Sequence, residues 1–162
     1  MIDEFDTFTF RRVVGRFAAP VAVVAANTAE GFRALTVSSF TSVSWDPPLV
    51  LVCIDTYFRG HDLLVEAPSF AISALSDRQE FIAERFAGRA PGSTGRFESV
   101  PHRLAPSGAP ILIGAIAWLD CRRVAVHPAG DHSILVGEAT SGDESGGSPL
   151  VYFTSTYVRV GD

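Results

Sequence analysis

Between Arg33 and Pro48 the sequence reads RALTVSSFTSVSWDPP, an extended stretch rich in hydroxyl side chains. Side chains of a strand alternate between two faces, so one face here would be small and polar. A buried hydroxyl without a partner costs about 1–3 kcal/mol, which makes this face a poor core. It suits a flat polar ligand lying against the strand, and a solvent-facing strand is the alternative that remains open. The residues on this face are Ala34, Thr36, Ser38, Phe40, Ser42 and Ser44.

A second candidate for chemistry is the motif Gly130-Asp131-His132. The aspartate and the histidine are adjacent at the expected start of a strand, so their side chains are predicted to point to opposite faces. We therefore expect no Asp–His pair, and His132 alone remains as a candidate. An exposed strand histidine without a catalytic role is the alternative.

The third candidate is Arg59-Gly60-His61-Asp62, which is expected to open a short helix. Free N–H groups at a helix N-terminus and the forked donor of Arg59 would suit a phosphate. The alternative is a solvated Arg59 with Asp62 complementing the helix dipole.

Several other chemistries lack their motifs. No glycine-rich dinucleotide fingerprint follows a strand, and no phosphate-binding P-loop occurs in this lysine-free sequence. The nucleophile elbow of the α/β-hydrolases is also missing. The four histidines are scattered, with no His/Cys spacing typical of zinc, so no metal site is expected.

Composition narrows the class of protein further. A net charge of −5 argues against nucleic acid or an anionic membrane as a partner. The apolar runs are shorter than the ~20 residues that span a bilayer, and no signal peptide is visible. Cys53 and Cys121 both lie in strand-like apolar runs, as expected of buried thiols in a reducing compartment, so we expect a cytoplasmic protein. Residues 1–162 are expected to form one domain, and the high apolar content hints at a homo-oligomer.

Hydrophobic periodicity places these motifs on an antiparallel scaffold. Residues 3–17 are expected to be a helix with an apolar stripe, 59–66 a short helix, and 76–79 a capping box that opens a third helix. The residues 28–31 predict a hairpin turn, and 88–108 predict a long loop. About seven strands without βαβ alternation favour a small antiparallel barrel with peripheral helices. The strand-like stretches, eight when each is counted separately, are 21–27, 33–46, 49–54, 70–75, 115–127, 133–140, 150–153 and 156–160.

Taken together, these pieces resemble the short-chain flavin reductase family, the NAD(P)H:flavin reductase partners of two-component monooxygenases. The resemblance rests mainly on ALTVSSFTSVSWDPPLVLVCID at 34–55 and GDHSILVGE at 130–138, in this order and spacing. It extends through FRRVVGRFAAPVAVV at 10–24, FAISALS at 70–76, GAIAWLDCR at 114–122 and PLVYF at 149–153. It implies a mainly β fold, an antiparallel Greek-key split β-barrel with a few peripheral helices, and a homodimer.

The resemblance also implies roles for particular residues. The cofactor FMN or FAD would lie along Thr36, Val37, Ser38 and Ser39, with Ser42 and Val43 nearby. Its phosphate would meet Tyr57, Phe58 and Arg59, and the loop 88–97, which includes Arg96, would approach the adenosine end of FAD. His132 and Tyr157 would face the nicotinamide of NADH or NADPH, with His132 positioning the ring for hydride transfer.

The implied activity is reduction of FMN or FAD by NADH or NADPH, with the reduced flavin leaving for a separate oxygenase. Two alternatives stay open. One is a split-barrel oxidase that keeps FMN tightly bound and uses it on an organic substrate. The other is a flavin-binding barrel without catalysis.

Overall fold

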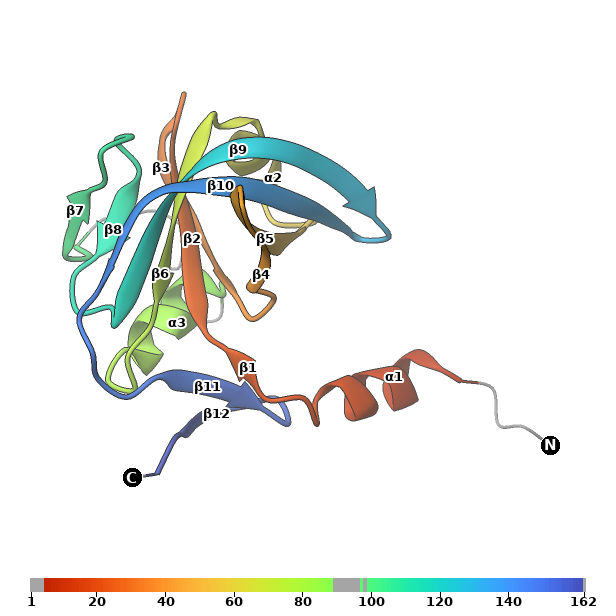
Figure 1. Ribbon diagram of the computed structural model, residues 1–162. Coiled ribbons are helices and arrows are strands. Elements are labelled where there is room, and N and C mark those ends of the chain that lie inside the picture. Colours follow the sequence, from red (N-terminus) through yellow and green to blue (C-terminus); the bar gives the residue numbers. More distant parts are fainter. Residues whose placement is uncertain (1–4, 89–96, 98, 162) are drawn as a thin grey trace.

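The structure, a computed structural model, describes residues 5–88, 97 and 99–161. It is mainly β, with 52% strand and 14% helix, which confirms the expected fold class. Figure 1 shows a body of curved sheet, an arm formed by two long strands, and an N-terminal helix that extends away from the body below this arm. No helix among the described residues has the length and apolar character needed to cross a membrane.

The main sheet has seven strands in the order β3-β2-β6-β9-β10-β5-β4, and every neighbouring pair is antiparallel. Its two edge strands are consecutive in the chain, so residues 38–40 connect one edge of the sheet to the other. The sheet curves but is not closed. Its strands are β2 (Ala22–Thr28), β3 (Gly31–Val37), β4 (Thr41–Trp45), β5 (Pro48–Asp55), β6 (Ser69–Ala74), β9 (Ala117–Ala129) and β10 (His132–Glu144).

Two small sheets complete the β-structure of the described residues. One contains β1 (Ala19–Pro20), β11 (Leu150–Phe153) and β12 (Thr156–Arg159). The other pairs β7 (His102–Leu104) with β8 (Pro110–Leu112). Strand β7 lies inside the stretch 88–108, so the expectation of a loop there is wrong for that segment.

The expected single strand from Arg33 to Asp46 is wrong, because the chain divides into β3 and β4 with a bend at 38–40. Ser39 holds this bend. The Cys53 N–H donates to Ser39 Oγ at 2.8 Å, and Ser39 Oγ–H donates to the Cys53 carbonyl oxygen at 3.3 Å. Strand β4 pairs with β5 only as far as Leu51, so the Ser39 side chain takes the place of the ladder at Cys53. The alternation of faces therefore holds within β3 but not across the bend.

Two apolar clusters sandwich β2, and a third, small cluster that includes Ala71 covers the second face of β6. One cluster fills the inside of the curved sheet and includes Val24, Val52, Phe70 and Leu135. The other lies on the opposite side and packs β2 against the helix α3 (Glu80–Phe86) through Val23. Burial on both faces explains why these strands read as nearly continuous apolar runs.

The helices differ from their predicted lengths and burial. The first, α1, spans only Thr7–Val14, with Asp6 as N-cap accepting a hydrogen bond from the Thr9 N–H at 2.7 Å. None of its residues is buried, so its apolar stripe does not pack into the core of the chain. The short helix α2 spans His61–Glu66. In α3, which spans Glu80–Phe86, Phe86 is buried whereas Phe81 is 68% exposed.

Candidate functional site

The end of β3 and the bend after it line a hollow of about 130 Å³. Thr36, Val37 and Ser38 form one wall, and Tyr157 of β12 contributes to another. The structure thus brings together residues about 120 positions apart in the chain. The Tyr157 ring packs against that of Tyr152, its partner across β11 and β12, with 5.5 Å between ring centres. The remaining lining residues are Val21, Ala87 and Tyr152.

The hydroxyls of this stretch do not all face a ligand. Thr36 Oγ1 donates to the Ala83 carbonyl oxygen at 2.7 Å, which ties β3 to α3, and the Ser39 hydroxyl is occupied by the Cys53 backbone. Ser38 is exposed, and its hydroxyl has no hydrogen-bond partner among the described residues. Ser42 and Val43 lie on the edge strand β4 and are exposed. Ser38 is therefore the hydroxyl best placed to meet a ligand.

A larger groove of about 680 Å³ adjoins this hollow at Ser38 and Tyr152. Its floor is the bend from Ser38 to Thr41, and its opposite wall is α1, through Phe10, Arg11 and Val14. This volume is in the range of cavities that hold drug-sized ligands and cofactors, roughly 300–1,000 Å³. An apolar wall, an exposed hydroxyl and one guanidinium fit a flat, partly polar ring system that carries an anionic tail.

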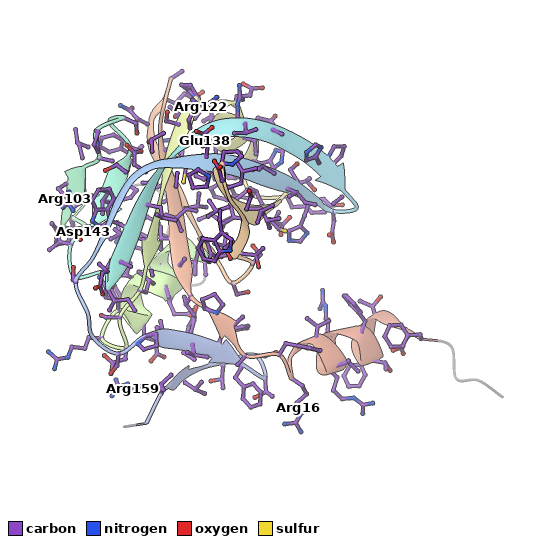
Figure 2. All side chains as sticks on the ribbon, in the orientation of Figure 1. Arg16, Arg103, Arg122, Glu138, Asp143 and Arg159 are labelled. Carbon is purple, nitrogen blue, oxygen red and sulfur yellow. The ribbon has the colours of Figure 1, made fainter. Side chains whose placement is uncertain are left out.

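The end of α1 is attached to the body of the fold next to the groove. The Thr154 N–H donates to the Gly15 carbonyl oxygen at 2.8 Å. The Arg16 guanidinium lies 6.0 Å from the centre of the Phe153 ring, and Figure 2 shows Arg16 beside this end of the helix. These contacts attach the segment that follows α1 to the end of β11, while α1 itself contributes residues to the groove wall.

The Asp131–His132 motif contradicts the prediction that the two side chains diverge. His132 Nδ1 and Asp131 Oδ1 are 2.7 Å apart and form a hydrogen bond. Asp131 precedes β10 and follows Gly130, whose φ of 62° turns the chain, so the alternation of strand faces does not apply to it. Because an ionised carboxylate only accepts, Nδ1 carries the proton and Nε2 of the neutral ring is an acceptor. His132 is 42% exposed at its side chain and can present this nitrogen to a ligand.

Neighbouring groups favour the ionised form of the Asp131 side chain. The hydrogen bond from the His132 side chain lowers the pKa of Asp131, and the positive charge of Arg11 lowers it further. Arg11 is one of the residues that line the groove. The 130–132 turn is nevertheless not part of either hollow, because its residues are not among those that line them.

The loop after β5 approaches the same turn. Asp55 is the register partner of His132, and the Thr56 N–H and Oγ1–H both donate to the Asp131 carbonyl oxygen, at 3.0 and 2.9 Å. Tyr57 next in sequence is 86% exposed. Phe58 is half-buried against the inner cluster, and its ring would lie 2.7 Å from a Cβ at position 60, so Gly60 is required there.

The structure gathers the predicted residues into two groups. Thr36, Val37, Ser38 and Ser39 lie at the hollow and groove with Tyr157, whereas His132 lies with the loop Tyr57-Phe58-Arg59 at the far end of β5. Arg59 is exposed just before α2. Arg96 lies outside the described residues. The bend at Ser39 links the groups, because it is bonded to Cys53 two residues before Asp55.

The groove also contains residues that the sequence argument did not assign to the site. Phe10, Arg11, Val14 and Tyr152 line it, yet the first three appeared only as a helical stripe with a flanking arginine. The signal available in the sequence was the apolar stripe of this helix, which had no strong core partner and could have indicated a role in the site. Among the described residues, no group of three or more His, Cys, Asp or Glu side chains could hold a metal ion.

An ion pair joins β9 and β10 where these strands pair with β6 and β5. Arg122 Nη2 and Glu138 Oε2 are 2.6 Å apart across the two strands, and Figure 2 labels both at the top of the body of the sheet. Both side chains are partly exposed, so we expect little contribution to stability from this pair.

The main sheet is antiparallel, curved and open, with a groove at its strand crossover, and its structural neighbours are flavin reductases with the split-barrel-like fold. Residues 14–161 of this chain match the family described as "Flavin reductase like domain". The chain belongs to this family.

Comparison with individual proteins gives the same assignment. The chain is 39% identical over 153 residues to FMN reductase (NADH) SmoA of Agrobacterium fabrum, covering 93% of this chain and 84% of that protein. It is 37% identical to the reductase component of 4-hydroxyphenylacetate 3-monooxygenase from Thermus thermophilus, covering 93% and 95%. Among solved structures, the NADH:FAD oxidoreductase SgcE6 of Streptomyces globisporus in complex with NAD and FAD fragments has a TM-score of 0.88 at 34% identity, covering 99% of this chain and 96% of that chain.

Proposed function

We propose that this chain is a flavin reductase that uses NADH or NADPH to reduce FMN or FAD and releases the reduced flavin to a separate monooxygenase. The observation that carries the proposal is the groove along the 36–41 stretch, with Ser38 exposed on it, in a chain of the flavin reductase family. Proteins named FMN reductase (NADH), and a monooxygenase reductase component, support both halves of the reaction.

When a flavin is bound, its ring system supplies the redox chemistry: NADH gives a hydride to N5 and a solvent proton completes the dihydroflavin, leaving NAD⁺. The protein has to hold two flat rings face to face at a near-attack separation of roughly 3–3.5 Å. Backbone N–H groups around Val37 and Ser38 and the Ser38 hydroxyl would hold one edge of the flavin and favour the negative charge that develops on it. Arg59, in the exposed loop with Tyr57 and Phe58, would bind the phosphate, and Ser42 and Val43 would border the ring on the β4 side.

His132 has the role of positioning the nicotinamide. Its Nδ1–H is held by Asp131, so the acceptor Nε2 is fixed in direction and can take a hydrogen bond from the carboxamide NH₂. Tyr157, in the hollow beside Thr36, would also face the nicotinamide. Arg96, in the loop predicted to reach the adenosine of FAD, completes the proposed set.

The test is NADH and NADPH oxidation with FMN, FAD and riboflavin supplied separately to purified protein. Oxidation that requires added flavin supports the proposal. A protein that purifies with tightly bound FMN and ignores NADH would instead be an oxidase on an organic substrate. Saturable flavin binding without any oxidation of either nicotinamide would indicate a non-catalytic flavin-binding barrel.

We further propose that residues 1–162 act as one domain in a cytoplasmic homodimer. Large apolar side chains lie exposed along α1 and just after it, and an exposed stripe of this kind is typical of a surface that a second copy covers. Both cysteines are unpaired, as in a reducing compartment. The exposed apolar residues are Phe5, Phe8, Phe10, Val13, Val14 and Phe17.

The dimer proposal is tested with Val13→Glu, because Val13 is 46% exposed on the stripe and does not line the groove. Light scattering after size-exclusion chromatography should show a shift toward monomer. Arg12→Glu is the matched control on the adjacent surface and should leave the mass unchanged. A wild-type protein that is monomeric at micromolar concentration would refute the proposal.

A further inference from the structure

A chain of hydrogen bonds connects α2 to β10 beside the proposed nicotinamide site. His61 Nδ1 is 2.7 Å from Asp62 Oδ1, and His61 Nε2 is 2.8 Å from Ser133 Oγ. The His61 side chain is 15% exposed, and Ser133 is 7% exposed. Residues 61 and 133 are 72 positions apart in sequence, so this contact exists only in the folded chain.

The proton positions in this chain follow from the chemistry of its members. The Asp62 carboxylate accepts a hydrogen bond and cannot donate one, so His61 Nδ1 carries a proton. In the neutral imidazole Nε2 is then an acceptor, and the Ser133 hydroxyl donates to it. The ring of His61 is thereby fixed in tautomer and in orientation by two partners.

This order of groups does not make a nucleophile of Ser133. A catalytic serine has to reach the reacting carbonyl, whereas Ser133 is buried in the sheet, with Ile54 of β5 as its register partner. The hydroxyl has a different consequence: it attaches the first buried residue of β10 to α2.

We propose that His61 is a positioning residue for His132 and acts through Ser133. Successive side chains of a strand point to opposite faces, so holding Ser133 on the inner face sets the direction of His132 on the outer face. The preceding residue, Asp131, is held from the other direction by Thr56 through its carbonyl oxygen. The backbone of the turn that carries His132 is paired with β5 and β9, and the bond from His61 to Ser133 adds a side-chain attachment on its buried face. This inference rests on the proposed function, in which His132 meets the nicotinamide.

The most selective variant is Ser133→Ala, which removes one oxygen from a buried position and leaves His61 Nε2 without its donor. Loss of one hydrogen bond is worth about 0.5–1.5 kcal/mol, so kcat should fall about two- to tenfold. The KM for flavin should stay within about twofold, because the groove at Ser38 is untouched. His61→Phe should show the same split between kcat and KM. His127→Ala is the control, since His127 is an exposed histidine on the same arm.

A double-mutant cycle separates positioning from general destabilisation. If His61 acts through His132, then Ser133→Ala in a His132→Ala background should cause no further loss of kcat. A double variant whose loss equals the product of the two single losses would overturn the proposal. So would a Ser133→Ala protein with unchanged kcat.

A readout without catalysis keeps the two proposals distinguishable. The NMR signals of the His132 ring should differ between the wild-type protein and the Ser133→Ala variant. In Ser133→Thr, which restores a hydroxyl, they should return toward their wild-type positions. Unchanged His132 signals in Ser133→Ala would refute the positioning role even in an active enzyme. If the wild-type protein oxidises no nicotinamide, the proposed function fails, while shifted ring signals would still show that His61 sets the geometry of the turn.

Discussion

Ser39→Ala is the substitution that best probes how the strand crossover is held. In the folded chain the Ser39 hydroxyl accepts from the Cys53 N–H at 2.8 Å and donates to the Cys53 carbonyl at 3.3 Å, beyond the point where β4 stops pairing with β5. Alanine leaves both backbone groups of a half-buried residue without this partner. An unsatisfied buried donor costs about 1–3 kcal/mol, and partial access of water reduces this to about 1–2 kcal/mol.

The expected effect on thermal unfolding follows from the size of the chain. For chains of this length each kcal/mol shifts Tm by about 2–4 °C, so Ser39→Ala should lower Tm by roughly 2–8 °C. Hydrogen exchange should locate the cause, because the Cys53 amide should lose protection while amides in β2 keep theirs. Flavin affinity should fall as well, since the bend that Ser39 holds is the floor of the groove.

A matched control lies one residue earlier. Ser38 is exposed and has no hydrogen-bond partner among the described residues, so Ser38→Ala should leave Tm within about 1 °C. Ser39→Thr retains the hydroxyl and should recover most of the stability. Equal Tm values for Ser38→Ala and Ser39→Ala, or an unchanged exchange rate at Cys53, would refute the reasoning.

Three further predictions concern the core and the turn. Gly137→Ala should destabilise the fold by about 1–3 kcal/mol in denaturant titrations, because the added Cβ would lie 2.5 Å from Phe70 Cζ and 2.9 Å from Cys121 Cβ. A variant as stable as the wild type would contradict this prediction, because it would show that the core accommodates the added methyl group. Burial, reinforced by the Asp120 charge, raises the pKa of Cys121 to about 12 from 9.0, so the unfolded thiol ionises first and stability should fall as pH rises from 9 toward 12; the fall should be smaller in Cys121→Ala, and identical pH profiles would contradict it. The pKa of Asp131 is lowered by the hydrogen bond from His132, so the pair should persist down to pH values below 3.8 and be lost as pH falls through the lowered pKa; NMR titration should show this pKa returning toward 3.8 in His132→Ala, and no change would count against the pair.

Local sequence patterns predicted much of the scaffold correctly. The hairpin turn at 28–31 and the strand Leu150–Phe153 follow from turn residues and β-branched or aromatic runs, which act over a few neighbouring residues. Part of the hydroxyl-rich stretch lines the groove, and the ligand-facing role of Ser38 remains a prediction.

Contacts between distant parts of the chain account for what local patterns missed. The break at 38–40 depends on the hydrogen bond between Ser39 and Cys53, which is 14 residues away. The Thr36 hydroxyl is bonded to the carbonyl oxygen of Ala83, which is 47 residues away. The Asp131–His132 pair was missed for a local reason, because the positive φ of Gly130 places the aspartate in a turn where strand alternation fails. The role of α1 as a groove wall could not be predicted, because an apolar stripe shows only that a helix has a contact face and not what covers it.

The most direct test of the account is to fill the groove and measure flavin reduction. Ser38 lines both hollows and is exposed, so Ser38→Trp should leave the circular dichroism spectrum and Tm close to those of wild type while blocking the flavin site. We predict that anaerobic addition of NADH to this variant and FMN or FAD bleaches the oxidised flavin absorbance at least tenfold more slowly than with wild type. A folded Ser38→Trp protein that reduces flavin at the wild-type rate would contradict the central claim that the flavin is bound along the 36–41 stretch.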